Sequence, residues 1–227
     1  MNEILKAKNM INILGKESSI LNQFIAELRD AGIQKDRMRF RANMERVGGI
    51  IAYEISKTLS YEEQETITPL GIASTPLLKE YPIVVSILRA GLPLHQGILN
   101  VFDGSDNGFI SAYRKHKKDG SFSISLEYIS CPNIEGKVII LADPMIATGS
   151  SVLMSYKALM EKGKPRHMHI VAVVASTQGI KHIRQNLPPG VTLWVGAVDD
   201  ELTAQSYIVP GLGDAGDLAY GTKEYKH

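Results

Sequence analysis

The stretch LADPMIATGSS, residues 141–151, decides the fold class of this chain. It continues the apolar run VIIL at 138–141, and its one acid, Asp143, precedes a proline and then small and hydroxyl-bearing residues. Such a run is typical of a buried parallel strand, and open α/β sheets bind ligands beyond the carboxyl ends of their strands. Small residues let backbone N–H groups approach an anion where a helix begins, near Ser150 or Ser151. The stretch predicts a phosphate-binding loop.

The chemistry of this loop favours a sugar phosphate. Thr148, Ser150 and Ser151 would offer hydroxyl donors to a monophosphate, and Asp143 would reach the ribose hydroxyls. A Walker A loop is excluded, because the loop has no lysine and the G-x-x-x-x-G-K-[ST] pattern is absent. An ordinary strand–turn–helix connection with a capping serine is the alternative interpretation.

The sequence on both sides of this loop alternates between strand and helix patterns. Apolar runs rich in valine and isoleucine lie at 82–88, 137–141, 169–175 and 191–198, and helical patterns lie between them at 91–102, 151–163 and 177–187. This alternation predicts an α/β fold with a doubly wound, mostly parallel sheet.

We expect one domain, residues 1–227, with three special segments. Helical periodicity at 18–30 and 34–60 predicts that residues 1–60 form an N-terminal helical extension. Residues 113–136 break the alternation and predict a projecting, flexible β arm. Residues 199–223 are rich in glycine and form a C-terminal segment without helical or strand periodicity.

The composition of the chain excludes disulfide-stabilised and cysteine-based zinc proteins and gives no sign of a nucleic-acid or membrane protein. The chain has 227 residues, a formal net charge of +1 and one cysteine, Cys131. It can therefore form neither an intrachain disulfide nor a cysteine-based zinc site, which fits a reducing compartment. The near-neutral charge gives no bulk attraction to nucleic acid or to a membrane, and we see no signal peptide or membrane span. We expect a cytoplasmic protein.

A second strand end carries an arginine. In SILRAGLPLHQGIL, residues 86–99, Arg89 stands beside Ala90 and Gly91 and before a helical pattern. A guanidinium group in this place could bind diphosphate oxygens in a forked geometry. Taken by itself, the pattern favours a surface arginine at a helix start over this interpretation.

The third stretch is SYIVPGLGDAGDLAYGTK, residues 206–223. Its four glycines and Pro210 predict a tightly turned loop whose backbone approaches a ligand. Backbone N–H and C=O groups suit a flat, amide-like ring such as a pyrimidine. A disordered tail is the alternative, which the apolar residues Val209, Leu212 and Leu218 disfavour.

Together the three stretches resemble the type I phosphoribosyltransferases, and among them most closely the uracil family. The resemblance runs from about residue 35 to residue 223 and is weakest at 115–136. It implies the type I phosphoribosyltransferase fold, with the C-terminal segment as a hood that binds the base. It also implies pyrimidine salvage, in which uracil and 5-phosphoribosyl-1-diphosphate give UMP and diphosphate.

The resemblance also assigns roles to individual residues. It implies that the donor sugar and its 5-phosphate contact Asp143, Pro144, Met145, Ile146, Ala147, Thr148, Gly149, Ser150 and Ser151. Arg89 and Arg114 would bind the diphosphate, and Ile208, Gly213, Asp214 and Ala215 would line the uracil. Asp214 would also lie near the donor, so Asp214 and Arg114 are the expected catalytic residues. Pro144 replaces a second acid that many phosphoribosyltransferases carry, as it does in uracil enzymes.

The same resemblance bears on cofactors and partners. One carboxylate in the loop is too little for a metal held by protein alone, so Mg²⁺ would arrive on the diphosphate, near Asp214. A homodimer or homotetramer is expected, and a GTP effector is left open. A pyrimidine-sensing or RNA-binding regulator on the same fold, with weak or no catalysis, is the alternative function. The near-zero net charge and the C-terminal loop argue against it.

Overall fold

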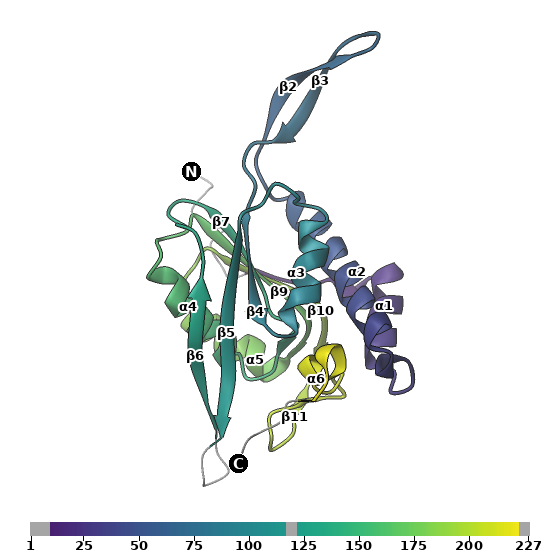
Figure 1. The fold of residues 1–227 in the computed structure, drawn as a ribbon, viewed down its shortest axis with the longest axis vertical. Helices are drawn as coiled ribbons and strands as arrows, with labels where there is room; N and C mark the ends of the chain where they lie inside the picture. Colours follow the sequence, from purple (N-terminus) through teal and green to yellow (C-terminus); the bar gives the residue numbers. More distant parts are fainter. Residues whose placement is uncertain (1–9, 117–121, 223–227) are drawn as a thin grey trace.

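One sheet of eight strands organises the computed structural model of the chain (Figure 1). Seven strands follow one another across the sheet in the order β1 (Met10–Ile13), β10 (Val191–Asp199), β9 (His167–Ser176), β7 (Val138–Ala142), β4 (Ile83–Leu88), β5 (Asn107–His116) and β6 (Phe122–Ser130). All neighbours pair in parallel except β5 and β6, and the short β8 (Met145–Ile146) pairs with β9. The predicted doubly wound, mostly parallel sheet is confirmed.

The structure describes residues 10–116 and 122–222, and between residues 112 and 126 it describes the backbone alone. The tip of the predicted arm lies outside this part of the chain. Among the described residues, no helix has both the length and the apolar character needed to cross a membrane.

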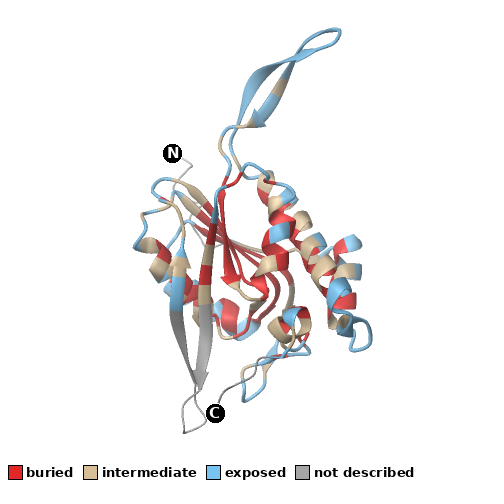
Figure 2. Ribbon diagram, in the orientation of Figure 1, coloured by how far each residue is buried: buried red, intermediate tan, exposed pale blue. Residues whose placement is uncertain are grey.

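Helices cover both faces of the sheet. On one face lie α1 (Ile20–Arg29), α2 (Arg37–Ser56) and α3 (Gly91–Leu99), and on the other lie α4 (Ser150–Met160) and α5 (Thr177–Asn186). Each face has its own cluster of buried apolar side chains. Figure 2 shows this burial along the strands and the inner sides of the helices. Strands covered on both faces explain why their sequences are apolar runs without alternation.

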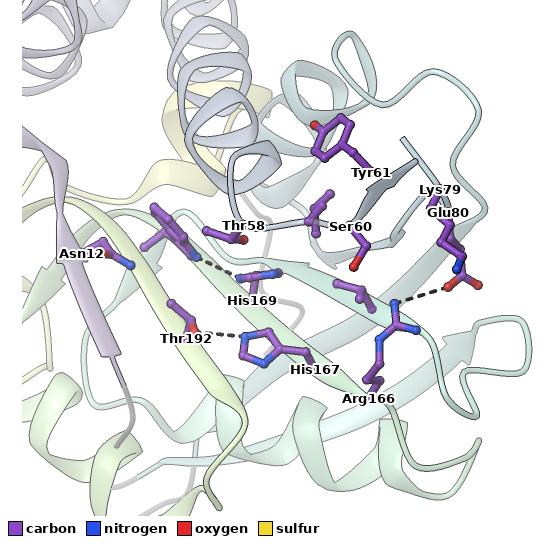
Figure 3. Close-up of a pocket in the computed structure, with 13 residues that line it drawn as sticks. Asn12, Thr58, Ser60, Tyr61, Lys79, Glu80, Arg166, His167, His169 and Thr192 are labelled. Atoms are coloured by element: carbon purple, nitrogen blue, oxygen red, sulfur yellow. Dashed lines mark hydrogen bonds and ion pairs between the residues drawn. The ribbon is translucent and has the colours of Figure 1, made fainter. Parts of the chain in front are cut away.

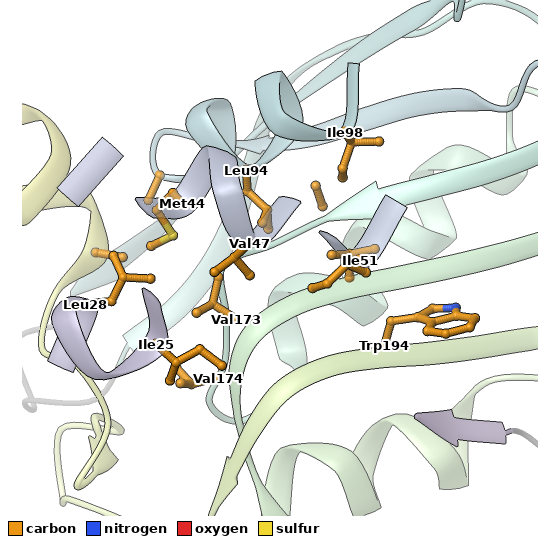
Figure 4. Packing of buried hydrophobic residues seen from close by; sticks show 14 of the residues in the cluster. Ile25, Leu28, Met44, Val47, Ile51, Leu94, Ile98, Val173, Val174 and Trp194 are labelled. Carbon is orange, nitrogen blue, oxygen red and sulfur yellow. The ribbon is translucent and has the colours of Figure 1, made fainter. Parts of the chain in front are cut away.

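Helix α2 packs most deeply. Met44, Val47 and Ile51 repeat at helical spacing, are fully buried, and face the side of the sheet that carries Trp194 (Figure 4). Full burial of such side chains contributes about 1.5–3 kcal/mol each. The backbones of α2 and α3 lie in close contact at Gly97 of α3, where a Cβ atom would lie 1.9 Å from a carbonyl oxygen of α2. The N-terminal helices are therefore part of the sheet's cover.

Two elements near the N-terminus were not predicted. Strand β1 adds an edge to the sheet inside the segment expected to be helical. Strands β2 (Tyr61–Thr68) and β3 (Gly71–Leu78) form an antiparallel hairpin that projects away from the sheet (Figure 1). Figure 2 shows this hairpin as almost entirely exposed. The chain thus carries a projecting β hairpin that its sequence did not indicate.

The arm predicted at 113–136 is also a hairpin, but it starts earlier. Strand β5 begins at Asn107 inside the sheet, and β6 continues the sheet as its one antiparallel edge. Beyond β10, the C-terminal segment forms β11 (Glu201–Leu202), β12 (Ile208–Val209) and the short helix α6 (Ala215–Tyr220). Helix α6 packs on α2 as the predicted hood.

The order of strands reverses between β4 and β7. From β4 the chain passes through α3 to β5 in one direction, and from β7 it passes through α4, β9 and α5 to β10 in the other. In open α/β sheets the crevice outside such a switch point is where ligands bind. The carboxyl ends of β4 and β7 therefore mark the candidate site.

Candidate active site

Arg89 and Asp143 are the first residues beyond the two strands at the switch point. Arg89 follows β4, Asp143 follows β7, and the paired strands bring these positions to the same edge of the sheet. Asp143 is buried, with 9% of its surface exposed, and its Oδ1 accepts a hydrogen bond from the Met145 N–H at 3.3 Å. A buried carboxylate at this edge suits recognition of ligand hydroxyl groups.

The loop after Asp143 leads into helix α4, as the sequence predicted. Gly149 precedes the helix with φ +78°, a left-handed conformation that favours glycine, and offers no side chain to cap the helix. The Thr148 hydroxyl accepts from the Ser150 N–H at 3.3 Å and donates to the Ser150 hydroxyl at 3.0 Å. The helix N-terminus and three hydroxyl-bearing residues thus meet in one short loop, which is favourable for an anion.

Hydrogen bonds from the end of β9 and from helix α5 fix this loop. The Ser176 hydroxyl donates to the Ala147 carbonyl at 2.6 Å, and His182 Nδ1 donates to the Thr148 carbonyl at 2.8 Å. Gly179 lets the two segments touch, because a Cβ atom there would lie 2.3 Å from the Ala147 oxygen. The sequence had shown no role for Ser176, Gly179 and His182, which lie about 30 residues beyond the loop.

The C-terminal segment makes tight turns, as its glycines predicted. Gly211 and Gly213 have φ of +55° and +90°. Ile208 and Ala215 are buried, and Asp214 caps α6 by accepting a hydrogen bond from the Asp217 N–H at 3.0 Å. Of the four residues expected to line the uracil, Ile208 lies on β12, and Gly213, Asp214 and Ala215 lie in the turn that leads into α6.

An ion pair ties this segment to the body of the protein. Both outer nitrogens of Arg29, at the end of α1, donate to the Asp199 carboxylate at 2.9 Å, and one of them also donates to the Gly211 carbonyl at 3.1 Å. The Gly211 N–H in turn donates to Asp199 at 3.0 Å. We call these contacts the Arg29–Asp199 clamp. No local pattern in the sequence indicates this clamp, because its two charged residues lie 170 positions apart.

Arg89 turns toward the hood in this structure. Its guanidinium donates to Asp217 Oδ1 at 3.0 Å and to the Gly221 carbonyl at 3.2 Å. Its Nε–H is buried and has no hydrogen-bond partner among the described residues. Arg89 thus connects the switch point with the segment that the sequence associated with the base.

Arg114 can be placed only by its backbone. It lies on β5 and pairs with Ile124 of β6, at the root of the predicted arm. Its side chain lies outside the described part of the structure.

The residues at this edge fit a hard cation that arrives with a ligand. Asp143 and Asp214 supply the oxygen atoms that Mg²⁺ prefers. Over residues 10–116 and 122–222, however, no group of three or more His, Cys, Asp or Glu side chains is close enough to hold a metal ion.

Comparison with known proteins gives the class. The sequence model described as uracil phosphoribosyltransferase matches residues 16–222. A protein of Porphyromonas gingivalis named uracil phosphoribosyltransferase is 52% identical over 92% of this chain and 97% of its own length. One of the same name from Thermococcus gammatolerans is 36% identical over 91% of each chain. The structure of the AQ2163 protein from Aquifex aeolicus superposes with a TM-score of 0.84, 29% identity, and coverage of 95% of this chain and 100% of that one.

The chain is therefore an enzyme of the phosphoribosyltransferase class, as the sequence predicted. Within that class it belongs to the uracil phosphoribosyltransferase family. None of these comparisons favours the alternative of a regulator.

Proposed function

We propose that the crevice between the switch point and the C-terminal hood converts uracil and 5-phosphoribosyl-1-diphosphate into UMP and diphosphate. The observation that carries this proposal is the match to the uracil family over residues 16–222, which spans the phosphate loop, Arg89 and the hood. The geometry supports it, because these three features meet at one edge of the sheet.

The donor would lie along the phosphate loop. Residues 143–151 bind the 5-phosphate and the ribose, with the backbone N–H groups at the start of α4 on the phosphate and Asp143 on the ribose hydroxyls. Arg89 and Arg114 bind the diphosphate. The unpartnered Nε–H of Arg89 supports this role, because a phosphate oxygen would satisfy a donor that is otherwise buried alone.

Uracil would lie against the C-terminal turn. Ile208 offers an apolar contact surface for the ring, and backbone groups of Gly213, Asp214 and Ala215 form hydrogen bonds with the ring's N–H and C=O groups. A flat ring with alternating N–H and C=O groups can pair with main-chain groups held in a fixed turn. The Arg29–Asp199 clamp supports this assignment, because it fixes the turn from two sides.

In the reaction the C1–O bond of the donor breaks toward an oxocarbenium-like state, and N1 of uracil forms the new bond to C1. The bonding electrons leave with the diphosphate, whose growing charge Arg89 and Arg114 stabilise. The N1 proton of uracil is lost, and Asp214 is the candidate base. Mg²⁺, when bound through the diphosphate, would neutralise part of the leaving group's charge. Positioning by the loop and the hood accounts for much of the rate.

The enzyme would work as a homo-oligomer in which hairpin β2–β3 contacts a second copy of the chain. Ile67, Leu70 and Ile72 expose 87%, 99% and 68% of their surfaces, and an isolated two-stranded hairpin is marginal in water. Sedimentation of the Ile67→Ser/Leu70→Ser variant tests this, and an unchanged oligomer would exclude the hairpin as its interface. A GTP effector remains a prediction, tested by adding GTP to the enzyme assay.

The first experiment incubates the chain with the donor, Mg²⁺ and a panel of bases, and measures nucleotide and diphosphate. UMP from uracil alone is expected. Asp143→Asn should abolish UMP formation with the fold intact, whereas Asp103→Asn, at an exposed position, should leave it unchanged. Wild-type activity in Asp143→Asn would remove the ribose role. Saturable donor binding without product from any base would favour the regulator.

Arg114→Ala separates the two substrates. It should raise the KM for the donor by about tenfold or more, the effect of losing one charge-assisted hydrogen bond, and leave the KM for uracil within about twofold. A larger effect on uracil than on the donor would contradict the diphosphate role of Arg114.

A further inference from the structure

A cavity lies at the opposite end of the sheet from the candidate active site. It has a volume of about 890 Å³ and lies among the first residues of β9 and β10, strand β1, the end of α2 and the root of hairpin β2–β3 (Figure 3). Ligand sites in proteins commonly have volumes of about 300–1,000 Å³. We propose that this cavity binds a planar organic phosphate, of the class of a nucleoside monophosphate, separately from the substrates.

The sheet surface under this cavity carries polar side chains, whereas the same face below α2 carries apolar ones. On the face covered by α2, strand β9 presents His167, His169, Val171 and Val173 in turn. The valines pack in the core below α2, but the histidines lie beyond the point where α2 ends, at Ser56. The end of the helix thus leaves a polar patch of sheet without a helical cover, and this patch forms the floor of the cavity.

The floor is polar but uncharged. Trp194 Nε1 donates to His169 Nδ1 at 3.0 Å, and His167 Nε2 lies 3.0 Å from the Thr192 hydroxyl. Burial, and then the neighbouring His167, lowers the pKa of His169 to about 3, and burial followed by the charge of Arg166 lowers the pKa of His167. Both rings are therefore neutral at pH 7, and the floor offers hydrogen bonds and ring surface.

The rim is positively charged. Arg166 and Lys79 line it, and Glu80 is the one carboxylate among the described lining residues. Glu80 is already engaged by Lys137, in a short contact, and by Arg166 at 3.4 Å. The rim therefore has two cations, Arg166 and Lys79, and one carboxylate that Lys137 already engages, and the long contact leaves most of the Arg166 guanidinium available. An anionic group would be favoured at this rim.

A buried donor points to a ligand that accepts hydrogen bonds. The Nδ2 of Asn12, on β1 beside Trp194, is buried and has no partner among the described residues. A buried donor without a partner destabilises the protein, and an acceptor on a bound molecule would remove that cost. A nucleoside monophosphate combines such acceptors with a flat ring for the floor and a phosphate for the rim.

This cavity is distinct from the candidate active site. Ser176, which supports the phosphate loop, lies seven positions beyond His169 on β9, so the two sites lie about 23 Å apart at ~3.3 Å per residue. The charged residues at its rim belong to none of the three stretches that carry the family resemblance.

The single tryptophan of the chain makes the proposal directly measurable, because Trp194 lines the cavity. The full chain is titrated with adenosine 5′-monophosphate, and the indole fluorescence is recorded with 5-phosphoribosyl-1-diphosphate and Mg²⁺ present in excess, because this donor fills the candidate active site but has no flat ring for the cavity floor. We expect a saturable change. Adenosine without its phosphate should bind at least about tenfold more weakly, because it lacks the anion that the rim attracts.

Charge variants complete the test. Arg166→Gln and Lys79→Gln should each weaken binding of adenosine 5′-monophosphate by about tenfold and leave the rate of UMP formation unchanged. Lys181→Gln, at an exposed position of α5 outside the cavity, should bind as the wild type does. The proposal is overturned if fluorescence shows no saturable change, if excess 5-phosphoribosyl-1-diphosphate abolishes the change, or if neither rim variant weakens binding.

Discussion

Replacing Asp199 by asparagine removes the charge at the centre of the Arg29–Asp199 clamp. The carboxylate accepts three hydrogen bonds, two from Arg29 at 2.9 Å and one from the Gly211 N–H at 3.0 Å. The asparagine side chain keeps one acceptor oxygen and brings an NH₂ group against a guanidinium. The variant therefore tests whether this clamp fixes the turn proposed to bind uracil.

The size of the effect follows from the contacts and their exposure. Removing one partner of a fully buried ion pair costs about 3–5 kcal/mol. Arg29 keeps 21% of its side chain exposed, so water compensates part of that loss, and we expect a cost nearer to one charge-assisted hydrogen bond, about 2–3 kcal/mol. For a chain of 227 residues this lowers Tm by about 4–12 °C.

The kinetic effect should fall on one substrate. Because the turn moves and the phosphate loop does not, the KM for uracil should rise by about tenfold, while the KM for the donor stays within about twofold. Steady-state assays of UMP formation and thermal unfolding measure both effects. The control is Glu54→Gln, which breaks the exposed Glu54–Lys57 pair and should change stability by at most about 0.5 kcal/mol. If Asp199→Asn matches this control in stability and the wild type in KM, the clamp has no role in the turn.

Two further predictions concern packing and acid stability. Gly179→Ala should lower kcat/KM for the donor by about 100-fold, because the added Cβ atom would lie 2.3 Å from the Ala147 oxygen and displace the phosphate loop. Gly49→Ala is the control, since its nearest atom lies at 3.5 Å and its kinetics should be near those of the wild type. Equal kinetics in the two variants would contradict the reasoning. Hydrogen bonds from Arg39 hold the pKa of Glu27 at about 2 instead of 4.5, so the contact stabilises the fold above about pH 4.5 and is lost as the pH falls toward 2. Urea unfolding at a series of pH values should show a smaller decline over this window in Glu27→Gln than in the wild type, and parallel declines would exclude the contribution.

The core of the fold could be predicted from the sequence because each central strand is buried on both faces. Burial on both faces gives uninterrupted apolar runs, and each of the four runs lies in a strand of the sheet. The helices between them also have the predicted locations, and α4 begins at Ser150, one of the two residues expected. Long and strongly periodic patterns carried this information.

Hairpin β2–β3 could not be predicted in this way. A strand is recognised by alternation when one of its faces packs on a core, and every residue of β2 is exposed. Strand β1 has only four residues, and helix α6 has only six, so neither is long enough for a period to appear.

Part of the site could not be predicted, because it is formed by contacts between residues that lie far apart in the sequence. Asp143 and the start of α4 lie where the sequence indicated, because both follow directly from the end of a strand. The contact between Arg89 and Asp217 joins residues 128 positions apart, and no local pattern encodes it. The sequence associated Arg89 with the diphosphate alone, whereas in the structure the same side chain also holds the hood.

The exposure of hairpin β2–β3 implies that this chain does not unfold as one cooperative unit. Within the described part of the chain, the hairpin shares no buried cluster with the sheet beyond Leu78 at its end, so it can open while the core remains intact. In the monomeric chain, amide hydrogens of residues 61–78 should then exchange with solvent far faster than those of β7 and β9. An unfolding curve recorded through Trp194 would therefore measure the stability of the sheet and leave that of the hairpin unseen.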